Sequence, residues 1–227
     1  TSELAQPASP VGRQRMDADI VCVGFGPATA GFLTTLSRQL LNPDGTPAVE
    51  SRVLPGAPPQ VLCYERADDL SFGVSGVVTR ARGLRASLPQ LNPREIPMAA
   101  PVTEERVVYL LDPLGVSRRS GPLRAADACL RAFRGLLPVR HEAFELPWAP
   151  AFLHKTGGLV LSMGQFLQWI GAQVQSSGTV QVWPGTPVAE ALIAGQKVEG
   201  VRLLDQGVDK QGRPGDGFMP GMDIPPR

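Results

Sequence analysis

The sequence has few of the residues from which metal sites and disulfides are built. Its 227 residues include three cysteines and two histidines, and the cysteines (Cys22, Cys63 and Cys129) form no Cys-x-x-Cys pair. Three separated thiols cannot build a disulfide framework or a four-thiolate iron–sulfur site. Two histidines argue against a histidine-based metal site. Cys22 and Cys63 lie inside apolar runs, where we expect a thiol to act as a small core residue.

Long apolar runs and a net charge of one sign are also absent. No run approaches the roughly 18 residues that a membrane-spanning helix needs, and the first residues lack the apolar segment of a secretory signal. The 22 basic and 21 acidic residues leave a formal charge of +1, which gives no long-range attraction for nucleic acid. We therefore expect a chain that faces a reducing, cytoplasmic compartment and has no nucleic-acid partner.

Glycine and proline are abundant instead. The chain has 25 glycines and 23 prolines, well above the usual combined usage of about 12%, which predicts long irregular connections. Residues 41–59 are dense in both and must form a loop. We expect a flexible arm over residues 1–17, one nucleotide-binding-type domain over 18–205 with an insertion at about 80–157, and a loop or free tail over 206–227.

Hydrophobic periodicity predicts regular structure at both ends of this domain. A continuous apolar run at 18–24 is typical of a buried strand, helical spacing follows from Pro27 to Leu41, and a second apolar strand covers 60–66. Further along the chain, the pattern predicts helices over 122–138 and 162–178, a strand over 179–185, and a hairpin over 187–205 that turns at Ala194-Gly195-Gln196-Lys197.

A Gly-x-Gly turn joins the first strand to the first helix. Gly24 stands where a tight turn is needed, and Gly26 where the backbone approaches a bound pyrophosphate. The N–H groups that follow, at Ala28 and Thr29, would face the anion with the helix dipole behind them. Thr29 occupies the position of a third glycine, so we expect the helix to stand slightly off the strand.

An acidic residue ends the second strand, as a dinucleotide-binding fold requires. Glu65 follows the apolar run and is suited to hold ribose hydroxyls. It lies further from Gly24 than the roughly 20 residues of the compact motif, because the loop 41–59 intervenes. Strand, glycine turn, helix and acid-terminated strand together predict an α/β fold with a Rossmann-like parallel sheet. Glu65 would suit the ribose of NAD(P) as well as that of FAD.

No catalytic constellation stands out elsewhere, so we name no catalytic and no metal-binding residue. The adjacent carboxylates Asp68-Asp69 and Glu104-Glu105 are typical of solvated surface. Residues 130–153 interleave arginines with Phe133, Phe144, Trp148 and Phe152. This composition suits docking to a membrane surface or a partner, and equally an ordinary core with a proline-rich cap.

Several segments, in order, resemble the N-terminal FAD-binding part of electron-transfer flavoprotein–ubiquinone oxidoreductases, which are glutathione-reductase-like flavoproteins. The resemblance covers about residues 19–214. It implies a Rossmann-like FAD-binding parallel sheet with an added β-hairpin or meander and long irregular insertions, incomplete at the C-terminus. The segments that carry it are DIVCVGFGPATAG, VLCYERADDLSFGVSG, PVTEERVVYLLD, GGLVLSMGQFLQWIGAQ, VQVWPGTPVAEAL and DKQGRPG.

The resemblance also implies a set of cofactor-binding residues. Glu65 would hold the adenosine ribose with Arg66 beside it, and Ser75 and Gly76 would lie near the flavin. Val188 falls where the family uses main chain to hold adenine. The residues that would face the FAD pyrophosphate are Gly24, Phe25, Gly26, Pro27 and Ala28.

The activity that the resemblance implies is electron transfer from an electron-transfer flavoprotein or other redox protein, through FAD and an iron–sulfur cluster, to quinone at the inner face of a membrane. The four cluster cysteines and the rest of the flavin site would lie beyond Arg227. Thr29 and Ser162 depart from the family pattern, which has glycine and arginine there. The alternative is therefore a non-catalytic subunit that retains the flavoprotein fold among further subunits, and whether the chain is an enzyme stays open.

Overall fold

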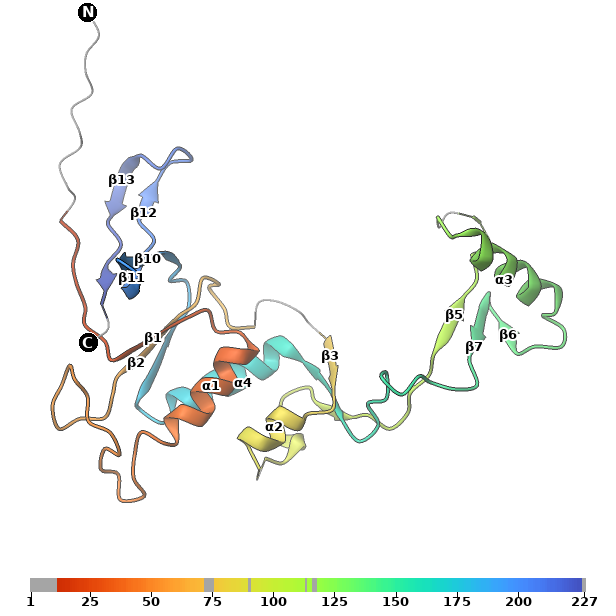
Figure 1. Ribbon diagram of the computed structural model, residues 1–227, viewed down its shortest axis with the longest axis horizontal. Helices are drawn as coiled ribbons and strands as arrows, with labels where there is room; N and C mark the ends of the chain where they lie inside the picture. Colours follow the sequence, from red (N-terminus) through yellow and green to blue (C-terminus); the bar gives the residue numbers. More distant parts are fainter. Residues whose placement is uncertain (1–11, 72–75, 90, 113, 116–117, 226–227) are drawn as a thin grey trace, which may run out of the picture. The chain divides into compact units, whose positions relative to one another are not determined.

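The computed structural model describes residues 12–71, 76–89, 91–112, 114–115 and 118–225. These residues fall into two compact units (Figure 1). Unit 2 overlaps part of the expected insertion at about 80–157, but residues 82–99 belong to unit 1. Unit 1 takes the described residues of Thr1–Val77, Arg82–Ala99 and Leu161–Arg227, and unit 2 those of Val78–Ala81 and Ala100–Val160.

The centre of unit 1 is a parallel sheet of three strands, which confirms the expected α/β fold. Its order is β1-β2-β9, with β1 at Ile20–Val23, β2 at Val61–Tyr64 and β9 at Val180–Trp183. β2 pairs in parallel with both neighbours and is buried at every residue. The uninterrupted apolar runs of the sequence follow from this burial on both faces.

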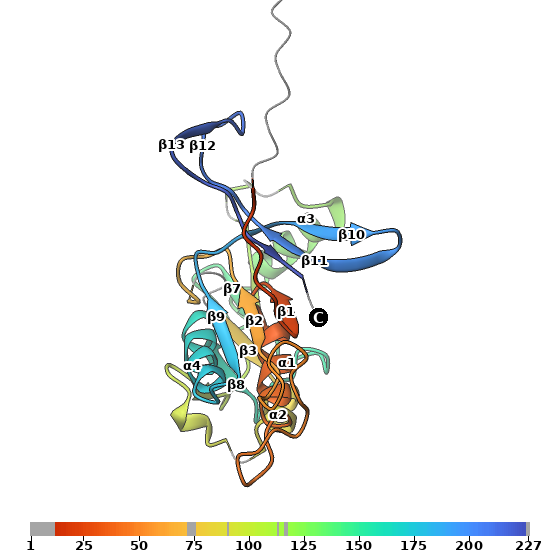
Figure 2. The same ribbon diagram turned by 90° about the vertical axis from the view of Figure 1, so that its left-hand side faces the viewer.

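Two helices cover one face of this sheet (Figure 2). They are α1, Pro27–Ser37, and α4, Met163–Gln175, and they pack against each other. Alternate strand residues face them, including Val61 and Cys63 of β2. Burial raises the pKa of the Cys63 thiol to about 12, so this cysteine is a neutral core residue at pH 7. The expected helix over 27–41 ends four residues early, before the Asn42-Pro43 step that disfavours helical backbone.

An antiparallel sheet covers the other face. The predicted hairpin is confirmed: β10, Val188–Ala194, pairs with β11, Lys197–Leu203, across a turn at Gly195-Gln196. A second core forms here between the parallel sheet and this hairpin. Its buried members are Ala18, Leu62, Tyr64, Val201, Leu203 and Ile224.

The C-terminal segment differs from the expected loop or free tail over 206–227. β12, Gln206–Val208, and β13, Pro214–Met219, form a hairpin, and β14, Asp223–Ile224, pairs with β11. Ile224 is fully buried. The segment has no local hydrophobic period. Its longest strand, β13, is mostly exposed, and β14, the strand that holds it to the core, has two residues.

The residues before β1 also differ from a flexible arm over 1–17, as far as the structure describes them. The N–H of Met16 donates to the Asp223 carbonyl at 3.1 Å, and the N–H of Asp223 donates to the Gln14 carbonyl at 2.9 Å. The Arg13 guanidinium donates to Asp205 at 2.9 Å. These long-range bonds fix residues 12–17 beside β14, while residues 1–11 lie outside the described part.

Asp19 holds the proline-rich loop 41–59 against the start of the sheet. Its carboxylate accepts from the Ser51 hydroxyl at 2.7 Å, from the Arg52 N–H at 2.7 Å and from the Gln60 N–H at 2.9 Å. Partial burial alone would raise the pKa of Asp19, but these donors outweigh it and hold that pKa below its usual value. The middle of the loop and the residue that follows it are thus both held by Asp19.

Unit 2 is built on a three-stranded antiparallel sheet and a helix. The sheet has the order β5-β7-β6, from Val108–Leu110, Ala143–Glu145 and Val139–Arg140. α3, Gly121–Ala132, is shorter than the expected helix over 122–138. The remaining elements among the described residues are β3 (Gly76–Thr79), α2 (Arg82–Ser87), a 3-10 turn η1 (Pro93–Glu95), β4 (Ala100–Pro101) and β8 (Leu159–Ser162).

Candidate nucleotide-binding site

The turn after β1 leaves the sheet through a glycine in left-handed backbone conformation. Gly24 has φ +83°, which other residues adopt only with strain. Its N–H donates to the Tyr64 carbonyl at 2.7 Å, so the turn begins while β1 is still bonded to β2. This geometry places the following residues at the carboxyl edge of the parallel sheet, the edge where such folds bind ligands.

Gly26 is the N-cap of α1 and its surroundings are open. A Cβ built there would meet no heavy atom within 4 Å, so the protein itself leaves room next to this backbone. Pro27 fills the first helical position, where its missing N–H costs nothing. In the structure described, the first turn of α1 has no acidic side chain and no capping side chain, and Ala28 is exposed. The N–H groups of Ala28 and Thr29 can therefore face an anion.

Glu65 is bonded directly to the glycine turn. Its Oε2 accepts from the N–H of Phe25 at 2.6 Å, and its Oε1 accepts from the N–H of Ala67 at 2.9 Å. The Glu65 main chain is fixed as well, because its N–H donates to the Trp183 carbonyl at 3.0 Å. Each carboxylate oxygen keeps a further lone pair. These lone pairs could accept hydrogen bonds from two hydroxyls of one ligand.

Phe25 and Arg66 have different surroundings. The Phe25 side chain is only 2% exposed and belongs to the core beneath the helices. Only its backbone is part of the turn, and its N–H is already used by Glu65. Arg66 is exposed, and its guanidinium makes no hydrogen bond and no ion pair with the other described residues. Its guanidinium is therefore free to meet a ligand phosphate or base.

The segment before β10 runs beside Glu65. The N–H of Thr186 donates to the Glu65 carbonyl at 2.8 Å, and the N–H of Gly185 donates to the Ala67 carbonyl at 2.8 Å. Val188, two residues beyond Thr186, begins β10 opposite Leu203. The structure thus brings the turn, Glu65 and the approach to Val188 together at one edge of the sheet.

The flavin-side residues are less defined. Ser75 lies outside the described residues. Gly76 is exposed and begins β3. The bonds that join the turn, Glu65 and residues 185–186 do not include Gly76, so its place near a flavin stays a prediction.

Two features that sequence reasoning missed pin the chain after Glu65 to α4. A Cβ at Gly164, in the first turn of α4, would lie 2.2 Å from the Ser71 carbonyl oxygen, so only glycine permits this close approach. Asp69 accepts from the Gln168 side chain at 2.8 Å. Ser162 caps α4 without a side-chain hydrogen bond. In the sequence, the one signal for this close contact is that Gly164 comes directly after the junction of a predicted strand and helix.

The described residues supply no metal centre and no membrane-spanning helix. No group of three or more His, Cys, Asp or Glu side chains among them is arranged to hold a metal ion. Likewise, none of the helices in that part of the chain is both long and apolar enough to cross a membrane.

A parallel sheet, a glycine turn that opens a helix, and an acid bonded to that turn define a Rossmann-like, dinucleotide-binding α/β fold. No protein-family model matches the chain. Curated relatives do: the chain is similar to electron transfer flavoprotein–ubiquinone oxidoreductases, which confirms the resemblance drawn from its motifs.

Three of these relatives show the extent of the similarity. The probable enzyme of Acinetobacter baylyi is 25% identical over 94% of this chain and 31% of its own length. The Pseudomonas aeruginosa enzyme is 26% identical over 93% of this chain and 32% of its own. The mitochondrial enzyme of Caenorhabditis elegans is 28% identical over 91% and 28%. The chain therefore spans about a third of the length of the curated relatives it matches.

Solved structures of FAD-dependent enzymes are also similar. The myxobacterial chondrochloren halogenase CndH has a TM-score of 0.48 at 12% identity, over 92% of this chain and 36% of its own. The flavin-dependent monooxygenase PieE, solved with FAD and substrate, has a TM-score of 0.47 at 17% identity, over 93% and 29%.

Proposed function

We propose that this chain is the FAD-binding portion of an oxidoreductase that passes electrons from a flavoprotein donor toward quinone. The observation that carries the proposal is the hydrogen bond from the glycine turn to Glu65, beside open space at Gly26. A pyrophosphate and a ribose are adjacent groups of one dinucleotide, and this arrangement offers a place for each. The similarity to electron transfer flavoprotein–ubiquinone oxidoreductases supports FAD as that dinucleotide.

The proposed roles follow from the placement of each group. The Gly26 backbone and the N–H groups at Ala28 and Thr29 bind the pyrophosphate, and Pro27 keeps the helix start rigid. Glu65 binds the ribose hydroxyls through its free lone pairs. Phe25 contributes through its backbone alone, because its side chain is buried.

The remaining cofactor contacts come from outside the turn. Arg66 offers a positive charge at the rim, the main chain at Val188 binds adenine, and Ser75 and Gly76 approach the flavin. FAD supplies the redox chemistry, while this chain binds and orients it. An iron–sulfur cluster is not assigned to this chain, whose three cysteines are too few for one.

We place the proposed electron transfer at the cytoplasmic face of a membrane. Unit 2 exposes several large apolar side chains: Leu136 is 86% exposed, Phe152 75% and Trp148 63%. Arg134 and Arg140 are exposed in the same unit. This composition suits attachment to an anionic lipid surface. The partners would be an electron-transfer flavoprotein or another redox protein, quinone, and further subunits.

A second candidate is a non-catalytic subunit of an electron-transfer assembly. Two observations favour it. Thr29 is half-buried where a glycine would allow closer packing, and Ser162 carries no charge where the resemblance leads us to expect arginine. Such a subunit would keep the fold and bind FAD weakly or not at all.

Binding of FAD to matched glycine variants separates the two. Gly26 has φ −86°, and its Cβ position is open, so Gly26→Val should fold normally while its side chain fills the ligand's space. Gly31→Val adds the same side chain within α1, where a Cβ also meets nothing within 4 Å. Flavin absorbance and fluorescence in purified protein give the result. Wild type and Gly31→Val should bind FAD and Gly26→Val should not, whereas equal flavin content in all three would remove the site from this turn.

A further inference from the structure

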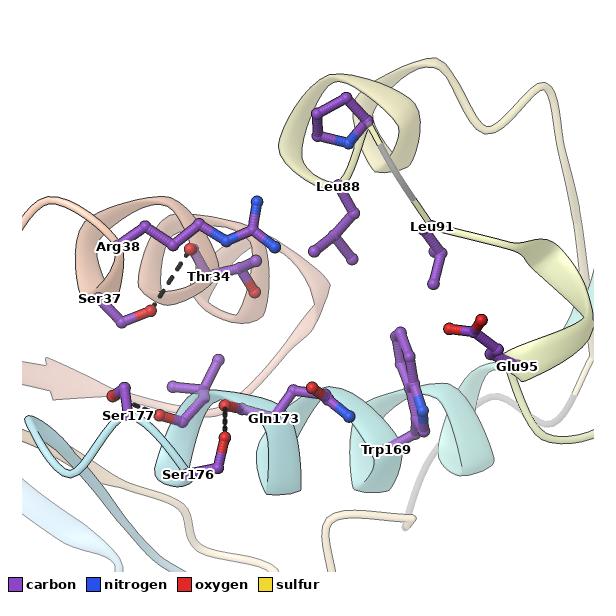
Figure 3. Close-up of a pocket in the computed structure, with 12 residues that line it drawn as sticks. Thr34, Ser37, Arg38, Leu88, Leu91, Glu95, Trp169, Gln173, Ser176 and Ser177 are labelled. Carbon is purple, nitrogen blue, oxygen red and sulfur yellow. Dashed lines mark hydrogen bonds between the residues drawn. The ribbon is translucent and has the colours of Figure 1, made fainter. Parts of the chain in front are cut away.

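A cavity lies beside the C-terminal ends of α1 and α4, away from the glycine turn. It measures about 700 Å³. α1 begins at the glycine turn, but the cavity is lined by its last residues, Thr34, Ser37 and Arg38. The C-terminal half of α4 forms the opposite wall, and Leu88, Leu91 and Glu95 close the third side (Figure 3). All of these residues belong to unit 1.

The hydroxyl groups of the cavity wall have already committed their protons. Thr34 donates to the Ala30 carbonyl at 2.7 Å and Ser37 to the Thr34 carbonyl at 3.4 Å. Ser176 donates to the Gln173 carbonyl at 2.7 Å, and Ser177 to the Val174 carbonyl at 2.7 Å. A hydroxyl has one proton and two lone pairs. Ser177 Oγ also accepts from the Thr179 N–H at 3.4 Å and lies 3.0 Å from the Thr179 hydroxyl, so its lone pairs are engaged. The other three hydroxyls therefore offer a ligand acceptors and no donors.

The C-terminal ends of both helices lie beside the cavity wall. α1 ends at Ser37 and is followed by its C-cap Arg38, whereas α4 ends at Gln175 with no basic residue in its last turn. A helix C-terminus carries roughly half a negative charge, and a cation near it is stabilised. Arg38 offsets this effect at the end of α1, so the end of α4 is the one that has no basic side chain in its last turn or at its cap.

One end of the cavity combines an aromatic face with a carboxylate. Trp169 of α4 and Glu95 of η1 point into the same space, below Leu91 (Figure 3). Glu95 is exposed, and among the described residues its carboxylate makes no hydrogen bond and no ion pair. Indole faces attract ammonium groups through their quadrupole.

The cavity's one lining cation is engaged elsewhere. Arg38 lies at the α1 side, and its Nη1 donates to the Ser87 carbonyl at 2.9 Å, at the end of α2. Figure 3 shows Arg38 and Glu95 entering from different walls. The cavity thus has the Arg38 guanidinium on one side and the Trp169 ring with the Glu95 carboxylate on the other.

We propose that this cavity is a binding site for a small organic cation, a quaternary or primary ammonium with an apolar body. The ammonium group lies against Trp169 and Glu95, and the apolar body lies against Leu88 and Leu91. The acceptor hydroxyls bind any N–H or water of the ligand's shell. The site depends neither on FAD nor on the proposed electron transfer, because it shares no lining residue with the glycine turn.

Choline and its uncharged isostere 3,3-dimethylbutan-1-ol, titrated calorimetrically into the whole chain with and without FAD, test the proposal. The two probes have the same shape and differ in charge. We expect choline to bind roughly tenfold more tightly than the isostere, as cation–π attraction and a partly solvated carboxylate allow. Equal affinity, or no binding of choline, would overturn the proposal.

Three variants locate the site. Glu95→Gln should weaken choline binding severalfold, whereas Glu199→Gln, an exposed glutamate on β11, should not. Arg38→Gln should leave choline binding unchanged or tighter, because it removes a like charge. Weaker binding in Arg38→Gln, preferential binding of acetate over choline, or equal affinities for Glu95→Gln and Glu199→Gln would contradict the assignment. All three positions are exposed, so the variants should fold.

Discussion

Replacing Glu65 by glutamine tests the bond that joins the second strand to the glycine turn. The carboxylate accepts from the Phe25 N–H at 2.6 Å and from the Ala67 N–H at 2.9 Å. A glutamine amide has one oxygen, so it can keep only one of these bonds. Its NH₂ group would face the other N–H, leaving two donors in contact.

The expected cost follows from these two contacts. A hydrogen bond to a charged group contributes about 1.5–3 kcal/mol, and the half-buried position of Glu65 favours the lower part of that range. We therefore expect Glu65→Gln to lower the free energy of unfolding by about 1.5–2 kcal/mol. We also expect faster hydrogen exchange at the Phe25 amide and weaker FAD binding.

Urea unfolding at pH 7 and amide exchange by NMR measure these effects. Glu50→Gln makes the same substitution at an exposed residue of the loop 41–59 and serves as the control. If Glu65→Gln and Glu50→Gln unfold at the same urea concentration and the Phe25 amide keeps its protection, Glu65 does not hold the turn.

Three further predictions concern the scaffold. Ile224→Ala should lower the free energy of unfolding by about 2–5 kcal/mol in urea titrations, because this side chain is fully buried; a smaller loss than about 0.5 kcal/mol would mean that β14 does not anchor the tail. The hydrogen bond from Arg13 holds the pKa of Asp205 at about 2, so the stability it gives is present above an unfolded pKa near 3.9 and is lost as the pH falls toward 2. Asp205→Asn should flatten this part of the acid-unfolding curve, and an unchanged curve would exclude the pair. Gly164→Ala should destabilise the fold, because its Cβ would lie 2.2 Å from the Ser71 carbonyl oxygen. Gly31→Ala should instead stabilise α1 by up to about 1 kcal/mol. Equal melting temperatures of these two variants would refute the close approach of Gly164 to Ser71.

The elements that the sequence predicted share a local signal. β1 and β2 each lie in a continuous apolar run, α1 and α4 have helical hydrophobic spacing, and the hairpin β10–β11 has a glycine at its turn. The C-terminal segment has no such signal. Its order comes from pairing with residues far away in the chain, such as the bonds between Asp223 and residues 14–16, and local periodicity cannot reveal these.

The same distinction applies to the candidate sites. The positions of Gly24, Gly26 and Glu65 at strand ends could be predicted, because each follows an apolar run, and their role in binding a nucleotide stays a prediction. The bond between Glu65 and the Phe25 N–H was not, because the sequence cannot show which donor a carboxylate meets. The cavity at Trp169 and Glu95 was not predictable either. It depends on Leu88, Leu91 and Glu95, which are distant in sequence from the two helices and line the cavity with them.

Binding of ADP to the purified chain tests the proposed nucleotide site most directly, because Gly26, Glu65 and Val188 are assigned to the ADP half of FAD. Calorimetry would compare wild type with Gly26→Val and with Gly31→Val. We expect ADP to bind wild type and Gly31→Val alike, and to bind Gly26→Val at least about tenfold more weakly, since a side chain at Gly26 fills the space of the pyrophosphate. Equal ADP affinity in all three proteins, or no binding of either ADP or FAD to wild type, would contradict the proposed site.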